Sequence, residues 1–355
     1  MTRMYAEAPE LRRIPLLDEA WSVRGHGLRL EAVRRGAHAL HAELGRGPRA
    51  VAVRSLTRSR LVYPTRHAFQ GAALSPAPFV VMVHRTLLVQ FLQAGDLKTL
   101  LFNPTDVEGA KRTPFFVKLL EKMPPQAVSL LAPPEPSLEA QLATHGLRPE
   151  DVDYLAFDHF HTQDVRGLPA QFPRAKLLAP RCEWEDWAHL HPMQAAWFVA
   201  DGREGVDPAR VVLTEGDLAL GDGVALVRTP GHTSGNQTLF VATENGIWGC
   251  SENATSADAY SPLDSRIPGL SRFARTYDVD LVMNLNTPEY GADQYTSMTL
   301  ERLVVDRVPH APGFVQMFPS SEVTPSALAP GLSPTLVFGS LSAGRVVTPQ
   351  RSAAE

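Results

Sequence analysis

The chain has 355 residues, 44% hydrophobic and 20% charged, which is an ordinary soluble composition with enough residues for one large core or two modest domains. Its formal net charge of −4 does not suggest a basic surface for binding nucleic acid. No apolar run reaches the roughly 18 residues that a membrane span needs. It has only two cysteines, and no basic segment followed by an apolar one opens it, so we expect a reduced, cytoplasmic protein.

The first 75 residues are predicted to form an N-terminal extension made of a helix and strands. Apolar residues recur at helical spacing over residues 28–44, and the glycines that follow predict the end of this helix. Residues 50–63 contain two apolar runs, which indicate a strand pair or a strand, a loop and a second strand.

Residues 79–102 are rich in β-forming side chains and are interrupted by a turn at Ala94-Gly95-Asp96. This pattern predicts a hairpin, which we place at the edge of a sheet. His84 lies in its first strand without partners at ligand spacing. We therefore interpret His84 as a partly buried, hydrogen-bonded histidine and not as a metal ligand.

The first chemical motif follows the apolar run at 154–157. His159 and His161 stand at the end of this predicted strand, where both imidazoles can point toward one metal ion. Asp158 and Asp164 lie beside them and can complete the metal shell, orient the rings or accept a proton from water. Taken alone, the motif also fits a polar loop capped by histidines.

A third histidine, His232, lies in a Pro-Gly-His-Thr turn after the strand-like segment 224–228. Three histidines from two separate strand ends match the three-ligand plan of a catalytic zinc site, which keeps one position for water.

The two motifs together resemble the metallo-β-lactamase fold superfamily, whose core pattern is His-x-His-x-Asp-His followed later by a Pro-Gly-His-Thr turn. The resemblance extends over roughly residues 78–290 and implies an α/β protein built as a four-layer αββα sandwich. We therefore predict an extension over 1–75, an αββα domain over 76–308, and an extended wrap or homodimer contact over 309–355.

The chain departs from the family pattern at the second metal site. Gln163-Asp164 stands where the family has Asp-His, and Glu252, or else Asn253, stands for the bridging aspartate. The segment after residues 280–283 contains asparagines and no histidine. We expect one ion per chain, most simply Zn²⁺ with iron or manganese left open, and the predicted ligands are His159, His161 and His232, completed by Glu252 or Asp164.

Residues 183–206 carry several aromatic side chains. In this fold such an insertion would hang over the metal and shape a pocket for an apolar or aromatic substrate, although the same aromatics could pack a helix onto the sheet. The predicted substrate contacts are Trp184, Trp187, Trp197, Asn253 and Tyr260.

The resemblance and the ligand set together imply metal-assisted hydrolysis of a small molecule at an ester, lactone, amide or carbon-halogen bond. Asp164 or Asp158 is the expected proton acceptor. An iron-dependent redox enzyme is one alternative, suggested by the carboxylates of Asp164 and Glu252. A binding protein that lost the second metal site and catalysis is the other.

Overall fold

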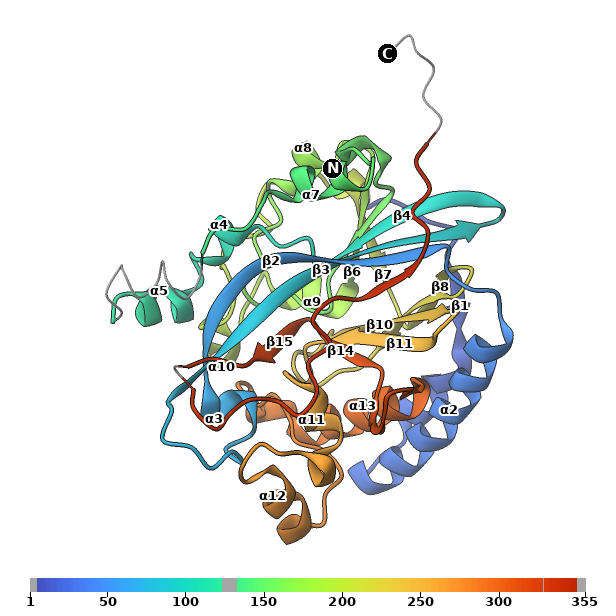
Figure 1. Ribbon diagram of the computed structural model, residues 1–355. Helices are drawn as coiled ribbons and strands as arrows, with labels where there is room; N and C mark the ends of the chain where they lie inside the picture. Colours follow the sequence, from blue (N-terminus) through green and yellow to red (C-terminus); the bar gives the residue numbers. More distant parts are fainter. Residues whose placement is uncertain (1–4, 123–132, 328, 350–355) are drawn as a thin grey trace.

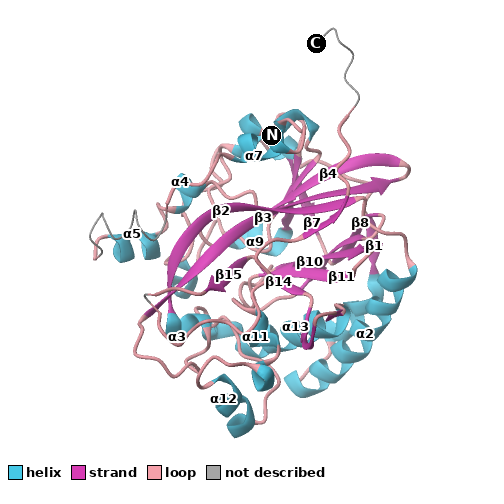
Figure 2. Cartoon of the chain, in the orientation of Figure 1, coloured by secondary structure: helices cyan, strands magenta, loops and turns pink. Residues whose placement is uncertain are grey.

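A computed structural model describes residues 5–122, 133–327 and 329–349 of the chain. Two β-sheets lie face to face in the middle of the molecule, and helices cover their outer faces (Figures 1 and 2). No helix in the described parts of the chain is long and apolar enough to cross a bilayer.

The larger sheet has eight strands and is antiparallel at one side and parallel at the other. In order across it, the strands are β16 (Ser342–Gly344), β2 (Ala52–Pro64), β3 (Phe79–Gln93), β4 (Asp96–Phe102), β5 (Tyr154–Ala156), β6 (Lys176–Pro180) and β7 (Val211–Thr214), and β15 (Ser321–Thr324) also pairs with β3.

The smaller sheet has six strands. They are, in order, β1 (Arg12–Ile14), β8 (Asp217–Gly221), β9 (Val224–Arg228), β10 (Gln237–Thr243), β11 (Gly246–Ser251) and β14 (Met317–Pro319). A separate antiparallel pair joins β12 (Arg307–Val308) to β13 (Ala311–Val315).

The helices are mostly short. They are α1 (Asp18–Ser22), α2 (His26–Arg46), α3 (Thr65–Ala68), α4 (Val107–Ala110), α5 (Pro114–Leu120), α7 (Leu138–Thr144), α8 (Leu168–Gln171), α9 (Arg181–Asp186), α10 (Pro192–Ala195), α11 (Ala257–Tyr260), α12 (Leu270–Tyr277) and α13 (Gly291–Val304).

Strand alternation divides the apolar side chains among three layers of core. Leu226 and Leu239 of β9 and β10 pack between the sheets with Phe102 of β4. Their chain neighbours Ala225 and Phe240 point the other way, into the core that α2 and α13 complete. A third core lies on the outer face of the larger sheet, below α7 and α9. The predicted α/β class with four αββα layers is confirmed.

Two local predictions need correction. The hairpin of β3 and β4 forms as expected, but it lies inside the sheet, because β2 pairs with β3 along 12 residue pairs. The predicted strand pair over residues 50–63 is instead the single long strand β2, which runs over Ala52–Pro64. A register shift between Thr57 and Ser59 leaves Arg58 as a bulge, and this polar interruption mimics a loop in the sequence.

The segments predicted to lie outside the central domain supply strands to both sheets. From residues 1–75 come β1 and β2, and from residues 309–355 come β14, β15 and β16. The first four residues of the predicted extension and the last six of the predicted wrap lie outside the described residues. The domain boundaries and the homodimer contact stay predictions.

Candidate metal centre

His159 and His161 lie in the loop that leaves the carboxyl end of β5. This strand is buried along its whole length in the parallel part of the sheet, so its end fixes where the loop begins. Thr162 then adopts φ of 62°, in the left-handed region that β-branched residues seldom enter. Its N–H donates to the carbonyl oxygen of Trp197 at 2.7 Å, which holds the chain in this turn directly after His161.

His232 lies in the connection between β9 and β10. Gly231 precedes it with φ of 140°, and a Cβ at this position would stand 2.2 Å from the backbone of Gln294. The turn is closed by Gly231 N–H donating to the Thr233 carbonyl oxygen at 2.8 Å. Only glycine fits this approach, and it delivers His232 to the same rim as the β5 loop.

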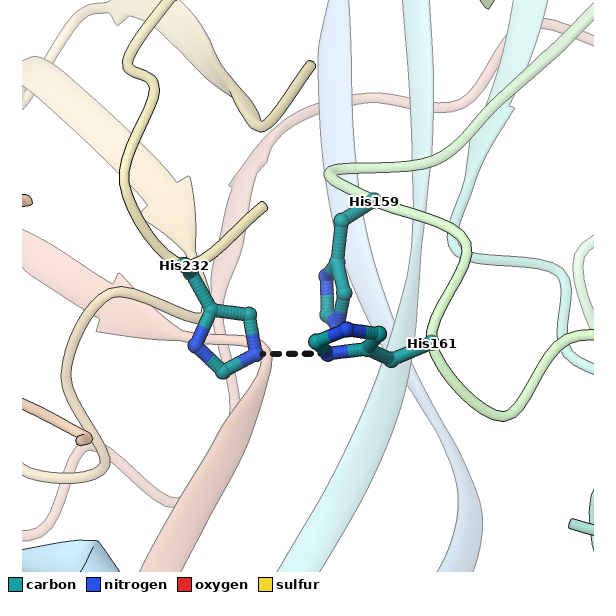
Figure 3. A group of neighbouring side chains, drawn as sticks. All are labelled: His159, His161 and His232. Carbon is teal, nitrogen blue, oxygen red and sulfur yellow. Dashed lines mark hydrogen bonds between the residues drawn. The ribbon is translucent and has the colours of Figure 1, made fainter. Parts of the chain in front are cut away.

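The three imidazoles converge, and all three are buried (Figure 3). One nitrogen from each ring lies within 4.8 Å of the others, and no other His, Cys, Asp or Glu of the described residues joins this group. His161 Nδ1 and His232 Nε2 are 3.3 Å apart. Two nitrogens that bind one tetrahedral zinc ion at about 2.0–2.1 Å stand roughly 3.3–3.4 Å apart, so this pair fits such an ion.

The nitrogen that faces the centre is set in two rings by a partner on the other nitrogen. His159 Nδ1 lies 2.7 Å from Asp158 Oδ1, which leaves Nε2 for a metal. His161 Nε2 lies 2.6 Å from Gln194 Oε1, which leaves Nδ1. Burial, reinforced by the neighbouring histidines, lowers the pKa of His161 and of His232 well below the usual value, so both rings stay neutral, as ligands must be.

The carboxylate of Asp158 is itself held by three residues, and His159 bonds it through both its ring and its backbone N–H. Asn103 Nδ2 donates to its Oδ2 at 3.0 Å, the Ser320 hydroxyl donates to the same oxygen, and His159 bonds the other oxygen. Burial alone would raise the pKa of this carboxyl. His159 and these hydrogen bonds outweigh burial and lower the pKa to about 2, so Asp158 stays an anion that orients His159.

Glu183 joins the two histidine loops. Its Oε1 accepts the Phe160 N–H at 2.6 Å, and its Oε2 accepts the Thr233 hydroxyl at 2.7 Å. Phe160 stands between the first two histidines and Thr233 follows the third. Burial raises the pKa of Glu183 to about 7. One buried carboxyl group therefore fixes the spacing of both loops.

The other predicted ligands lie apart from this group. Asp164 accepts from Arg112 Nη1 at 2.8 Å and from Arg166 Nη2 at 2.6 Å. Glu252 is buried and lines the same cavity as the three histidines, and burial next to Asp158 raises its pKa well above the usual value. Asn253 turns away, with its amide donating to Glu301 Oε1 at 2.8 Å.

Some of the predicted substrate contacts are buried in the core, and one lines the cavity. Trp184 and Trp187 are buried in the core below α9. The hydroxyl of Tyr260 donates to Glu301 Oε2 at 2.6 Å, in the core with α13. Trp197 lines the cavity, at 4.4 Å between ring centroids from Phe115. His84 is hydrogen-bonded to Ser321 and Thr105, as the sequence predicts, and it also lines the cavity.

The cavity in front of the histidines has a volume of about 490 Å³. Its wall is largely apolar, which suits a substrate with a hydrocarbon or aromatic part. The apolar lining includes Leu61, Met82, Val107, Phe116, Leu119 and Trp197.

Two packed sheets with helices outside and three histidines at one rim are the metallo-β-lactamase fold, as the sequence resemblance implies. The crystal structure of a probable metal-dependent hydrolase from Staphylococcus aureus superposes with a TM-score of 0.51 at 14% identity, covering 70% of this chain and 83% of that one. No family model matches the chain.

Two curated relatives are similar over a shorter stretch. An N-acyl homoserine lactonase of Bacillus sp is 30% identical over 99 residues, which make up 28% of this chain and 36% of that protein. The N-acyl homoserine lactonase AiiA of Bacillus thuringiensis subsp. kurstaki is 33% identical over 100 residues, again 28% of this chain and 36% of the relative. The match thus spans about a third of the relatives' length.

Proposed function

We propose that this protein is a metal-dependent hydrolase of small molecules and that His159, His161 and His232 hold one zinc ion per chain. The observation that carries the proposal is the convergence of three buried imidazoles, two of them held by Asp158 and Gln194 so that one nitrogen of each is left for a metal. A divalent ion held by three histidines keeps a position for water and lowers the pKa of that water toward about 7.

The three predicted carboxyl groups near the histidines have different roles. Asp158 fixes His159 and has both oxygens engaged, so it is poorly placed to accept a proton. Asp164 is held by two guanidinium groups. Glu252 is the remaining predicted carboxyl group, and it lines the cavity. We assign Glu252 the role of fourth ligand, or of proton acceptor if the positive charge of a bound ion favours its anion over the protonated form that burial favours.

The substrate class follows from the cavity and from the relatives. The apolar wall fits an acyl or aryl group next to the scissile bond, and the matched relatives are N-acyl homoserine lactonases. We therefore place lactones and activated esters with an apolar group first among the substrates of this protein. Amides and carbon-halogen bonds come second.

The test combines elemental analysis with a hydrolysis screen of N-hexanoyl homoserine lactone and 4-nitrophenyl esters. We expect about one zinc per chain and turnover of at least one substrate. His232→Ala should lose both the metal and turnover, whereas His189→Ala, at an exposed position, should keep both.

Two outcomes would redirect the proposal. Iron in place of zinc would favour the redox alternative, and a fully metal-free protein that binds no added zinc would favour the binding protein. Glu252→Gln separates its two roles, because loss of a ligand lowers zinc affinity and loss of a proton acceptor lowers kcat at unchanged zinc content.

A further inference from the structure

Arg58 is the one residue of β2 that the β-ladder skips. The register with β3 shifts between Thr57 and Ser59, so that Arg58 has no partner across the strand. A bulge of this kind bends a strand and re-aims a side chain. Here Arg58 lines the cavity that also holds the three histidines.

The guanidinium of Arg58 is poorly satisfied by the protein. Nη2 donates to the carbonyl oxygen of Thr105 at 3.2 Å, and Nη1 reaches that of Pro136 only at 3.4 Å. Nε is buried and has no hydrogen-bond partner. Two of the five N–H groups of an arginine are thus used, and one on each Nη is left for a ligand.

No carboxylate of the described residues forms an ion pair with Arg58 within 4.0 Å. Asp106 is the carboxylate that interacts electrostatically with Arg58. It accepts hydrogen bonds from the backbone N–H groups of Glu108 and Gly109 at 3.1 Å and caps α4.

The other cations at the cavity wall are neutralised. Arg60 pairs with Glu135 at 3.5 Å, and Lys111 pairs with Glu108 at 2.6 Å. Burial lowers the pKa of Arg58, which shows that water solvates its charge incompletely. A partly buried cation that forms no ion pair costs free energy, and an anionic ligand would recover part of it.

Arg58 is also connected to the metal centre. The Thr105 residue whose carbonyl accepts from Arg58 bonds His84 Nε2 through its hydroxyl at 2.8 Å. His84 lines the cavity and interacts electrostatically with Asp158 and His159. The guanidinium and the three histidines line one cavity of about 490 Å³, so a small molecule that fills it can contact both.

We propose that Arg58 binds a carboxylate of the substrate, so that the protein hydrolyses a small acidic ester or lactone whose carboxylate lies a short chain from the scissile bond. The inference rests on the proposed function, since it deepens the substrate class of the same cavity. Arg58 is a specificity residue and takes no part in breaking the bond.

The test uses two substrates of matched shape, 4-nitrophenyl hydrogen glutarate and its neutral amide counterpart, 4-nitrophenyl glutaramate. The zinc-loaded wild type should prefer the acid. Arg58→Met should lower the acid-to-amide ratio of kcat/KM by roughly 10- to 100-fold, mainly through KM, because a hydrogen bond to a charged group is lost. Arg58→Lys should fall between the two, since it keeps the charge and loses the fork.

Arg54→Met is the matched control. Arg54 lies on the same strand and donates to the carbonyl oxygens of Ala343 and Gly344, so its loss affects folding but not the cavity. Its acid-to-amide ratio should equal that of the wild type. An unchanged ratio in Arg58→Met, or a wild-type preference for the amide, would overturn the inference.

A binding experiment separates this inference from the proposed function. If no ester or lactone is turned over, the proposed function fails, and the zinc-loaded proteins are titrated calorimetrically with the glutaramate anion. At least 10-fold weaker binding to Arg58→Met than to wild type would support a carboxylate site all the same. Equal affinities would reject it.

Discussion

Glu183→Gln tests whether the metal centre depends on the carboxyl group that joins its two loops. The wild-type carboxyl group accepts one N–H from Phe160 and one O–H from Thr233, at 2.6 and 2.7 Å. Glutamine keeps the shape but has a single acceptor oxygen, so one of the two donors meets an N–H₂ group instead. A buried donor without a partner costs about 1–3 kcal/mol.

This cost should appear chiefly in zinc affinity. The strain falls between His159 and His161 on one loop and next to His232 on the other, so the nitrogens lose their preset spacing. Substitutions of residues that support metal ligands typically weaken metal binding roughly 10- to 100-fold. Such a change agrees with the 1–3 kcal/mol lost, because about 1.4 kcal/mol corresponds to one factor of ten.

The assay is zinc competition with a chromophoric chelator, and urea unfolding of the metal-free protein measures the fold separately. Glu185→Gln on the same helix is the control, since the Glu185 side chain is 61% exposed and, among the described residues, forms an ion pair only with Arg181. The reasoning is refuted if Glu183→Gln loses unfolding free energy but binds zinc within twofold of the wild type. Glu183 would then support the fold alone.

Two further predictions concern other carboxyl groups. Burial raises the pKa of Asp217 from its ordinary 3.8 to about 6, so the stability that its protonated form contributes is complete below pH 3.8 and lost as pH rises through 6. The difference in unfolding free energy between Asp217→Asn and wild type should therefore shift by about 3 kcal/mol in favour of the variant when the pH rises from 3.5 to 7.5. Urea titration of both proteins at both pH values measures this shift, and a pH-independent difference would contradict it. Asp164→Asn should keep full zinc content and change stability only slightly, because its partners Arg112 and Arg166 are partly exposed and water screens both ion pairs; zinc loss by elemental analysis would instead make Asp164 a ligand.

The three candidate ligand histidines are predictable from sequence because each belongs to a local pattern. His159 and His161 follow a short buried strand, and His232 follows a Pro-Gly turn, so strand ends alone predict one rim for all three. The residues that orient them carry no such signal. Asn103 and Ser320 reach Asp158 across 55 and 162 positions of the chain, and only the assembled sheets bring them together.

The aromatic segment shows why residue type predicts burial better than function. Trp184 and Trp187 are three positions apart, so one helix face presents both to the core. Trp197 has the same side chain but stands after α10, where Phe115 packs beside its ring and the cavity begins. The spacing of the first two fits either a lid or core packing, and only the fold shows that they are in the core, whereas the place of Trp197 depends on α5, which the sequence does not link to it.

At Arg58 the local sequence pattern predicts a different structure from the one that the fold adopts. In the sequence, its polar neighbours Thr57 and Ser59 indicate a loop between two strands. The fold instead extends one strand through them, because β3 offers a continuous partner and the bulge absorbs one extra residue. The bulge that interrupts the β pattern at Arg58 therefore also explains why this arginine lines the cavity. In a regular β-ladder, successive side chains would alternate between the two faces of the sheet.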